Sequence, residues 1–579
     1  MRRLASDETS LGLASLSLRR ERASGPVLLY SVVFLLVLGL VAAPLLFLLV
    51  NSFQLAQPGQ PSRWGFDAWS ETLANGAVWR AMWNSIRLYL ATSAISWPTA
   101  ITLAWILGRT DIPRRNWIEF LFWLSFFLPA LTIVMGWITL IDPTTGLVNQ
   151  AIHAMPPLEA LIGRFNIYTF WGLVWVHLGQ NAIALKTILL VPAFRNLDAA
   201  MEEASRLCGA GPFGTLRRVV IPLMGPAIII TALLGFVRLW QSFETEMVLG
   251  IPQGFYVYGT KIYDLLNAET PDYGEATVLA VLVIAITAPF MVLQQRFSVR
   301  RSYETITGRA RFEPTRLGRA KWPVFAGVMG IALFTSLLPI LAVTMATFMK
   351  VFGHFELAQP WTLAHWSQVL ADPLFDQAIL NTLFIAGGTA AGGVVLCTLV
   401  AYILVRTDFR PRNALDLLTW LPHALPGMLI GLGFLWVVLT WVKPLYGSLA
   451  LLMLVTTISG MTVGVQIIKS NMIQLGSEME EASRVAGGSW LYTMRRVVLP
   501  PLAPVLVLVG TLNFVSASRD VSNIILLSSG RSMTLALLQL DYMVAPYWES
   551  ATVVAVVMTI ISTGVALIAR LCNIRIGMR

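Results

Sequence analysis

Residues 202–226, EEASRLCGAGPFGTLRRVVIPLMGP, recur at residues 480–504 as EEASRVAGGSWLYTMRRVVLPPLAP. The two stretches align without a gap at an offset of 278, and 13 of their 25 positions are identical. Each stretch is polar, carries arginines, and lies between long apolar runs. Membrane spanning alone does not explain a duplicated polar stretch in such a chain.

The composition is that of a polytopic membrane protein. Of the 579 residues, 56% are hydrophobic and 12% are charged, with a mean hydropathy of +0.70, whereas soluble domains carry roughly 25% charged residues. The net charge of +10 is concentrated in short loops, as expected when lysine and arginine set membrane topology. We therefore expect a lipid bilayer as partner and no nucleic acid. The three cysteines show no repeated spacing, which argues against a disulfide framework.

Twelve apolar runs are each close to the roughly 20 residues that a bilayer requires. The predicted fold is an all-α protein of about 12 transmembrane helices in two six-helix repeats. The predicted spans are 26–50, 83–108, 117–142, 168–193, 223–248, 274–295, 322–349, 380–405, 414–442, 447–468, 502–526 and 549–570.

Loop charges predict the orientation. With the N-terminus in the cytoplasm, the cytoplasmic segments hold thirty lysines and arginines, and the opposite loops hold seven. This bias places both termini and both copies of the duplicated stretch in the cytoplasm. The predicted regions are a basic N-terminal segment (1–25), a first repeat (26–295, duplicated loop 194–222), a basic linker (296–321) and a second repeat (322–579, loop 469–501).

The repeat extends beyond the loops. Arg109-Thr110-Asp111 matches Arg406-Thr407-Asp408, and Pro129 matches Pro426, all at an offset of 297. Because each repeat has six spans, both have the same orientation. The two repeats are therefore related by an axis along the membrane normal.

Motifs for catalysis are missing. The sequence contains no GxxxxGK[ST] phosphate loop, no HExxH and no paired CxxC. We predict no catalytic, cofactor-binding or metal-binding residues and no enzyme activity in this chain. Uphill transport would then need an ion gradient or a partner that hydrolyses ATP.

Each duplicated loop is predicted to form a short helix, a glycine turn and a second, basic helix that ends at a proline. Glu202 and Glu480 begin the first helix, where carboxylates favour the helix dipole. Gly209 and Gly487 permit the turn. Such a compact knob suits a groove on another protein.

These residues resemble the EAA loop of ABC-importer permeases. The matching cores are Glu203-Ala204-Ser205…Gly209 and Glu481-Ala482-Ser483…Gly487, with serine in place of the third motif residue. The resemblance covers nearly the whole chain as two fused units of a type I ABC importer permease. Phe243–Tyr263 is similar to the ferric-iron group, which is related to the polyamine and thiamine permeases.

The resemblance implies a permease of the bacterial inner membrane with two kinds of protein partner. A homodimeric ATP-binding subunit would dock on the loops from the cytoplasm, and ATP and Mg would be bound there. A periplasmic or extracellular solute-binding protein would deliver the cargo, ferric iron. The residues expected to couple transport to ATP hydrolysis are Glu202, Glu203, Ala204, Gly209, Glu480, Glu481, Ala482 and Gly487.

Polar residues inside predicted spans are candidates for the translocation path, because burying them in lipid is costly. They are His177, Gln180, Asn181, Gln241, Glu244, Glu246, Arg519, Asp520 and Asn523. The alternative is mutual pairing that stabilises the fold, for instance between Arg519 and Asp520.

Three alternative functions remain open. The cargo could be a polyamine, thiamine or another small solute. An ion-coupled secondary transporter would also have two six-span halves, but it would need no ATP-binding partner. A membrane scaffold that transports nothing would have no cavity lined by these polar residues.

Overall fold

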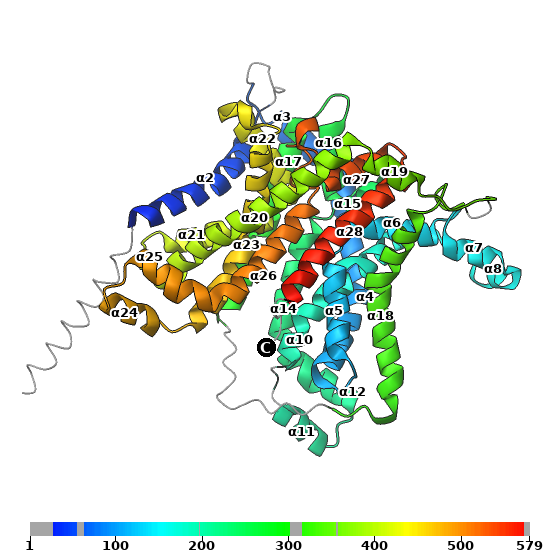
Figure 1. Cartoon of the computed structure of the whole chain (residues 1–579), viewed down its shortest axis with the longest axis horizontal. Helices are drawn as coiled ribbons and strands as arrows, with labels where there is room; N and C mark the ends of the chain where they lie inside the picture. The colour runs from blue at the N-terminus through cyan, green and yellow to red at the C-terminus, as the bar shows by residue number, and fades with distance from the viewer. Residues whose placement is uncertain are drawn as a thin grey trace, which may run out of the picture.

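The computed structural model describes residues 27–54, 63–195, 197, 199–300, 315–354 and 357–571. Within these ranges the chain is helical and the only β pairing is three isolated bridges. The predicted segment 1–25 and residues 301–314 of the predicted linker 296–321 lie outside the described residues. Figure 1 shows two groups of long helices that diverge from a shared region.

The first half contains these helices: α2 (Val27–Asn51), α3 (Asp67–Ala74), α4 (Gly76–Arg109), α5 (Arg115–Phe127), α6 (Ala130–Ile141), α7 (Leu147–His153), α8 (Pro156–Ile162), α9 (Phe170–His177), α10 (Ile183–Arg195), α11 (Ala199–Leu207), α12 (Pro212–Thr215), α13 (Ile221–Leu223), α14 (Gly225–Leu239), α15 (Glu244–Leu249), α16 (Tyr258–Asn267) and α17 (Tyr273–Arg300). Two π-helical turns, Leu178–Ala182 and Leu216–Val220, join neighbouring helices.

The second half contains these helices: α18 (Lys321–Ala346), α19 (Ala364–Leu370), α20 (Pro373–Arg406), α21 (Arg412–Ala424), α22 (Gly427–Trp441), α23 (Leu449–Gln474), α24 (Glu478–Val485), α25 (Trp490–Thr493), α26 (Leu499–Ser518), α27 (Leu535–Val544) and α28 (Trp548–Leu571). A π-helical turn, Met494–Val498, joins α25 to α26.

The predicted class, an all-α polytopic membrane protein, is confirmed. In the described part of the chain, 9 helices are long and apolar enough to cross a membrane, and the number is 12 if each bent helix pair counts as one span. The twelve predicted spans correspond to this larger number.

The third span of each half is broken at a proline. The chain bends by 102° between α5 and α6, and by 112° between the corresponding helices α21 and α22. The residue before each proline is extended, with ψ of 140° at Leu128 and 136° at Leu425. Proline disfavours the helical conformation in the residue that precedes it, and it lacks an N–H for the helix. The matching prolines therefore explain both breaks.

The first span of each half packs against the broken span of the other half. α2 packs on α21 and α22, and α18 packs on α5 and α6. The contacts are close enough to require glycine: a Cβ on Gly433 would lie 2.9 Å from the Pro44 Cβ, and a Cβ on Gly136 would overlap Pro339. The two halves are therefore interlocked rather than side by side.

The fifth spans are shorter than predicted. Helix was expected over 223–248 and 502–526, but α14 ends at Leu239 and α26 ends at Ser518. The chain then turns, and in the first half a new helix, α15, begins at Glu244. The early helix ends are explained by the polar residues that follow them. Gln241 and Arg519 donate hydrogen bonds to backbone carbonyls of other helices rather than continuing their own helix. Gln241, Glu244, Arg519, Asp520 and Asn523 consequently lie beyond the fifth-span helices.

Candidate functional site: the duplicated loops and the interface between the halves

Each duplicated loop folds as predicted up to its glycine turn. Gly209 and Gly487 have φ of +82° and +79°, a conformation that side chains with a Cβ rarely adopt. The turn closes with a hydrogen bond from Ala210 N–H to Ser205 O (3.1 Å), and Gly488 N–H donates to Ser483 O (2.8 Å) in the other copy. These bonds from residue six to residue one end α11 and α24 in the same way.

The serine in the third motif position contacts the second part of its loop. The Ser205 hydroxyl lies 3.0 Å from the Thr215 hydroxyl, and Ser483 lies 2.9 Å from Thr493. Both serines and both threonines are among the identical positions of the two loops. Each pair joins the two arms of a loop, which gives the departure from the family pattern a structural role.

A buried ion pair fixes each loop to the second span of its own half. Arg109 Nε donates to Glu202 Oε1 at 2.8 Å, and Arg406 Nε lies 2.8 Å from Glu480 Oε1. The carboxyl side chains are only 6% exposed in both copies. The arginines also donate to backbone carbonyls, Arg109 to that of Leu197 and Arg406 to that of Leu475. The matching Arg-Thr-Asp triplets were the sequence signal for this anchor.

Burial distinguishes the two adjacent glutamates of each loop. All four glutamates were predicted to couple transport to ATP hydrolysis, and the carboxylates of Glu202 and Glu480 face the permease itself. The next residues, Glu203-Ala204 and Glu481-Ala482, are exposed. Because the side chains of adjacent residues point in different directions on a helix, one glutamate anchors the loop and the other faces outward.

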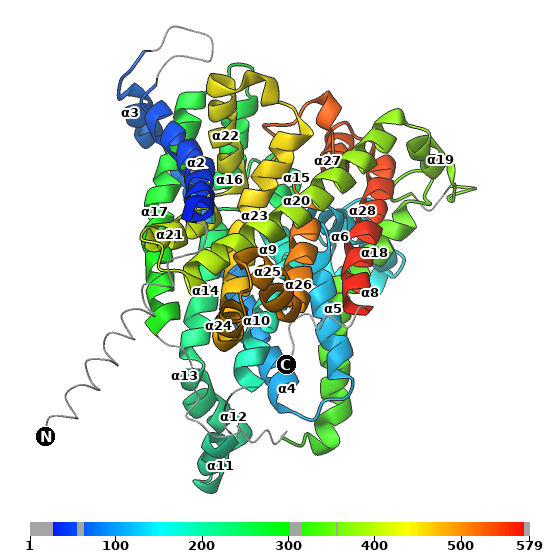
Figure 2. The same cartoon turned by 60° about the vertical axis from the view of Figure 1, so that its left-hand side comes forward.

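The outward surface of each loop is also apolar. Leu207 is 89% exposed and its counterpart Val485 is 91% exposed, and Met201 and Met479 are both 49% exposed. These side chains lie on the first helix of each loop and come in matched pairs. Figures 1 and 2 show α11 and α24 at the ends of separate groups of helices, each projecting from the molecule.

The second arm of each loop differs from the prediction. We expected a helix ending at Pro222 or Pro500, but in the second half one continuous helical segment runs from Trp490 to Ser518. A π-helical turn directly before Pro500 widens the helix, so that the proline ring and its missing N–H are accommodated. In the first half the same arm bends by 65° after Leu223.

The end of the inter-half linker is attached beside the first anchor. Thr315 N–H donates to Arg109 O at 2.8 Å, Leu317 N–H donates to Asp111 Oδ1 at 2.9 Å, and Lys321 lies 3.2 Å from Asp111. The Leu317 N–H, assisted by Lys321, lowers the pKa of Asp111. In the second half, Asp408 pairs only with nearby Arg412, at 3.4 Å.

At the interface, each half donates hydrogen bonds to the broken span of the other. The Gln241 amide donates to the carbonyls of His423 (3.0 Å) and Leu425 (3.2 Å). Arg519 donates to the carbonyls of Phe126 (2.6 Å) and Leu128 (2.8 Å). Gln241 and Arg519 are aligned in the repeat, and so are their acceptors. We call these four bonds the reciprocal latch.

The acceptors of the latch are carbonyls that the helix breaks release. Near each break, helix carbonyls lose their partners and need other donors. A long side chain from the opposite half supplies them. Arg519 and Asp520, the example given for the alternative of mutual pairing, do not hydrogen-bond to each other. Asp520 accepts bonds from the Asn523 N–H and from the Asn523 side-chain amide.

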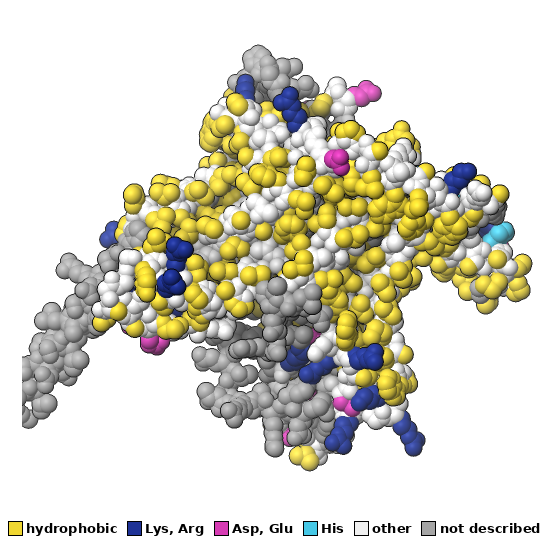
Figure 3. Space-filling model, viewed as in Figure 1, with side chains coloured by type: hydrophobic (Ala, Val, Ile, Leu, Met, Phe, Trp, Pro, Cys, Tyr) yellow, Lys and Arg dark blue, Asp and Glu magenta, His cyan; other side chains and the backbone are white. Residues whose placement is uncertain are grey.

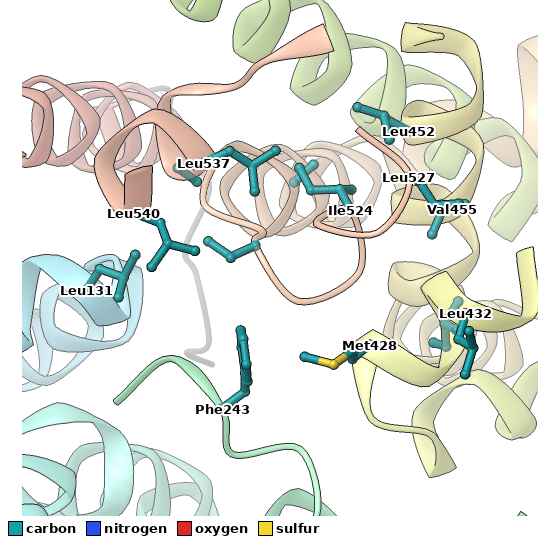
Figure 4. Packing of buried hydrophobic residues seen from close by; sticks show 14 of the residues in the cluster. Leu131, Phe243, Met428, Leu432, Leu452, Val455, Ile524, Leu527, Leu537 and Leu540 are labelled. Carbon is teal, nitrogen blue, oxygen red and sulfur yellow. The ribbon is translucent and has the colours of Figure 1, made fainter. Parts of the chain in front are cut away.

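Apolar residues close the space beside the latch. Leu131 and Met428, each two residues beyond a break, are aligned in the repeat and are 3% and 2% exposed. Figure 4 shows Phe243 and Met428 extending toward the same space, with Leu540 and Ile524 facing them from other segments. All five side chains belong to one buried cluster contributed by both halves.

The remaining candidates for the path fall into two groups. His177 contacts Glu246 at 2.7 Å, and Ser242 donates to the same carboxylate oxygen at 2.5 Å, so these residues form a buried network within the first half. The Gln180 side chain lies 3.5 Å from the Thr245 hydroxyl, a second contact between the fourth span and α15. By contrast, Glu244 lies within electrostatic reach of Asp520 and Arg519 of the other half.

Two further features concern the cargo. Gln180 and Asn181 each have a buried side-chain atom without a hydrogen-bond partner, at the level of the π-helical turn Leu178–Ala182. No group of three or more His, Cys, Asp or Glu side chains in the described ranges could hold a metal ion.

The comparisons with known proteins agree with this architecture. The family described as "Binding-protein-dependent transport system inner membrane component" matches residues 100–303 and 393–577, more than half of the chain. A putative ferric transport system permease protein FbpB 1 from Haemophilus influenzae is 27% identical over 79% of this chain and 71% of its own length.

Two other relatives are similarly distant. A probable ABC transporter permease protein, y4fN, from Sinorhizobium fredii is 26% identical over 78% of this chain and 79% of its own. A ferric transport system permease protein FbpB from Actinobacillus pleuropneumoniae is 25% identical over 79% of this chain and 65% of its own.

A polytopic helical chain with two projecting EAA-like loops is a permease subunit of an ABC importer. The chain belongs to the family of binding-protein-dependent inner-membrane permeases, here with two permease units fused in one polypeptide. It is therefore a multi-pass protein of the inner membrane.

Proposed function

We propose that this chain supplies both halves of the translocation path of a ferric-iron importer and is driven by a separate homodimeric ATP-binding subunit. The observation that carries the proposal is the matched pair of loops, each anchored by a buried Arg–Glu pair and exposed at its tip. Two equivalent loops fit a partner that is itself two-fold symmetric.

The loops are suited to transmitting force. A buried ion pair ties each loop to a long span, α4 or α20, so a movement of the loop would be passed to that span. The exposed Leu207 and Val485 provide apolar contact area, and Glu203 and Glu481 provide charge next to it. Apolar centres with charged rims are typical of protein interfaces.

The reciprocal latch and the apolar residues beside it would form the gate. In the present conformation the two loops lie apart while the latch joins the two halves. Closure of an ATP-bound dimer would draw the loops together, and the halves would rotate about their interface until the latch bonds break. The path would then open on the opposite side of the membrane, where a solute-binding protein delivers its cargo.

Ferric iron is the cargo that the relatives favour. Two of the three relatives above are described as ferric transport permeases. Glu244 and Asp520 would attract a cation near the gate, while Arg519 beside them would prevent tight retention. A path must release its cargo, and most of the specificity would reside in the solute-binding protein. With the loops in the cytoplasm, both termini would be cytoplasmic.

The docking role is tested in proteoliposomes that contain the chain with its ATP-binding and solute-binding partners. We expect the double variant Glu203→Lys/Glu481→Lys to lose ATP-driven uptake, because two positive charges replace the exposed carboxylates at the docking surface. The control is Asp408→Lys, an exposed acid in the α20–α21 loop, which should keep uptake. Normal uptake by the double variant would refute docking through these loops.

The cargo is tested in the same vesicles. Radioactive ferric iron should accumulate only with ATP and the solute-binding protein, whereas labelled spermidine and thiamine should not. Accumulation driven by a proton or sodium gradient without ATP would support the secondary transporter instead. Purification in mild detergent provides an independent check, since an importer should retain its ATP-binding subunit.

A further inference from the structure

The segment between α6 and α9 forms a hairpin of two short helices that has no counterpart in the second half. α7 (Leu147–His153) and α8 (Pro156–Ile162) project sideways from the molecule, at the right edge of Figure 1. The equivalent connection in the second half, between α22 and α23, is a short turn that includes Lys443–Leu445.

Hydrogen bonds fix the base of the hairpin to the ends of neighbouring spans. The Asn149 amide donates to the carbonyls of Asp142 (2.7 Å) and Phe165 (2.8 Å), which brings the two ends of the hairpin together. The Gln150 amide donates to Gly353 O at 2.6 Å, a few residues beyond the end of α18. The hairpin is thus held rigidly at the level where these spans end.

This level is at the opposite end of the fourth span from the first duplicated loop. The span that follows the hairpin runs from Phe170 to Arg195 and has 26 residues, a length of about 39 Å at 1.5 Å per residue. Its far end, Arg195, contacts Glu119 near the loop face. The hairpin therefore lies where the spans emerge from the hydrocarbon on the other side.

The hairpin exposes large apolar side chains. Leu161 is 81% exposed, Ile162 52%, Met155 50% and Phe165 46%. Single exposed apolar residues are normal on a protein surface, but four within eleven positions of a projecting element form a patch that needs a partner. Figure 3 shows hydrophobic side chains over the lower part of the projection, the side toward which α18 descends.

Polar groups in the same hairpin are paired with one another. Glu159 accepts a bond from Arg164 Nε at 2.8 Å and lies 2.9 Å from His153 Nδ1. His153 and Arg164 are 67% and 49% exposed. A short element with apolar groups and a solvated polar cluster is the composition of a helix that lies in a membrane interface.

We propose that the α7–α8 hairpin is a membrane-surface anchor that inserts Met155, Leu161 and Ile162 among the lipid headgroups and upper acyl chains. The lateral position favours lipid over a protein partner, because the hairpin projects at the edge of the molecule (Figure 1). The next helix along the chain, α9, carries Trp171 and Trp175, which are 65% and 42% exposed. Tryptophans are enriched at the headgroup level of membrane proteins.

The anchor would hold one side of the permease at a fixed depth while the halves rotate. The assignment of the hairpin to the outer leaflet rests on the proposed cytoplasmic position of the loops. Insertion itself does not depend on the cargo, on the ATP-binding partner or on that orientation.

The experiment measures depth with a fluorescent label on the full chain. Leu161→Cys is made in a background without the three native cysteines, labelled with bimane and reconstituted in nanodiscs of phosphatidylethanolamine and phosphatidylglycerol. The matched control is Glu71→Cys, an exposed position on α3 at the same end of the molecule. Quenching is measured with lipids that carry a nitroxide near the headgroup and, separately, with iodide in the water.

We expect the label at 161 to be quenched by the nitroxide lipid at least about twofold more than the label at 71, with the reverse order for iodide. Adding Ile162→Glu to the labelled chain should raise the access of iodide at 161 without changing position 71. Equal quenching of the two labels by nitroxide lipid would overturn the anchor. Because no transport is measured, this result is independent of the proposed importer function.

Discussion

At the residue scale, the two adjacent glutamates of each duplicated loop have opposite tasks. Glu202 and Glu480 are buried against arginines from the second spans, while Glu203 and Glu481 face outward. The sequence alone does not distinguish the two glutamates, because both are acids near the start of the same helix. Their separation depends on which side of that helix faces the rest of the permease.

Removing one partner of a buried anchor should be costly. Arg406→Ala would remove the arginine 2.8 Å from the buried Glu480 and leave Arg484, at 3.9 Å, near that carboxylate. We expect the free energy of unfolding to fall by about 3 kcal/mol, the lower end of the range for a broken buried pair. The control is Arg412→Ala, whose exposed pair with Asp408 should contribute at most about 1 kcal/mol. Thermal unfolding of the purified chain in detergent compares the two. Equal melting temperatures would contradict the anchor.

The glycine turns provide a second test. Gly209→Val with Gly487→Val forces a branched side chain into positive φ, which costs about 1–2 kcal/mol at each position and should distort the loop tips. We expect ATP hydrolysis to become independent of the solute-binding protein. Gly211→Ala is the control, because that residue has open space around it and no positive φ. Wild-type coupling in the double variant would exclude a role for the turn geometry.

At the element scale, the first span of each half is held by the broken third span of the other. The two contacts are built alike, with a glycine on the broken span facing a proline of the first span: Gly136 with Pro339 and Gly433 with Pro44. The glycines align at the offset of 297. The repeat thus preserves a packing contact between halves, which no pattern within a single span reveals.

Filling that contact should loosen the interlock. Gly433→Ala places a methyl group 2.9 Å from the Pro44 Cβ, and such overpacking typically costs about 1–3 kcal/mol. We expect a lower melting temperature and easier separation of the halves by detergent after the linker is cut with an engineered protease site. Gly330→Ala on α18, which meets nothing within 4 Å, should leave both unchanged.

At the scale of the whole molecule, the reciprocal latch joins the two halves while the duplicated loops lie apart. Its four hydrogen bonds connect the end of each fifth span to the broken third span of the other half. If the halves rotate against each other during transport, as proposed above, these bonds between them would break. The latch would therefore set the balance between the two conformations.

Breaking the latch should shift that balance. Gln241→Ala with Arg519→Ala is expected to raise ATP hydrolysis in the absence of the solute-binding protein. The present conformation, with the loops apart, would lose four hydrogen bonds worth about 0.5–1.5 kcal/mol each, or more for those that Arg519 donates. The control is Gln377→Ala, since Gln377 also donates to two carbonyls, those of Gly530 and Arg531, but within one half. Unchanged basal hydrolysis in the double variant would exclude the latch from gating.

The sequence by itself determined the class of the protein. Long apolar runs must be spans because a bilayer leaves backbone groups no other partner. The duplicated loops, their glycine turns and their family resemblance also followed from local pattern, since a positive φ is a property of one residue. The matching prolines were visible as well, although the breaks of 102° and 112° were not.

Only the tertiary structure decided what each polar residue does. The pairing of Arg109 with Glu202 and the bonds from Gln241 and Arg519 connect positions 93 to 393 residues apart. The fifth spans end early, and their polar residues bind carbonyls that the proline breaks release in the other half. Such partners are set by how the two halves interlock, and hydropathy along the chain contains no information about that arrangement.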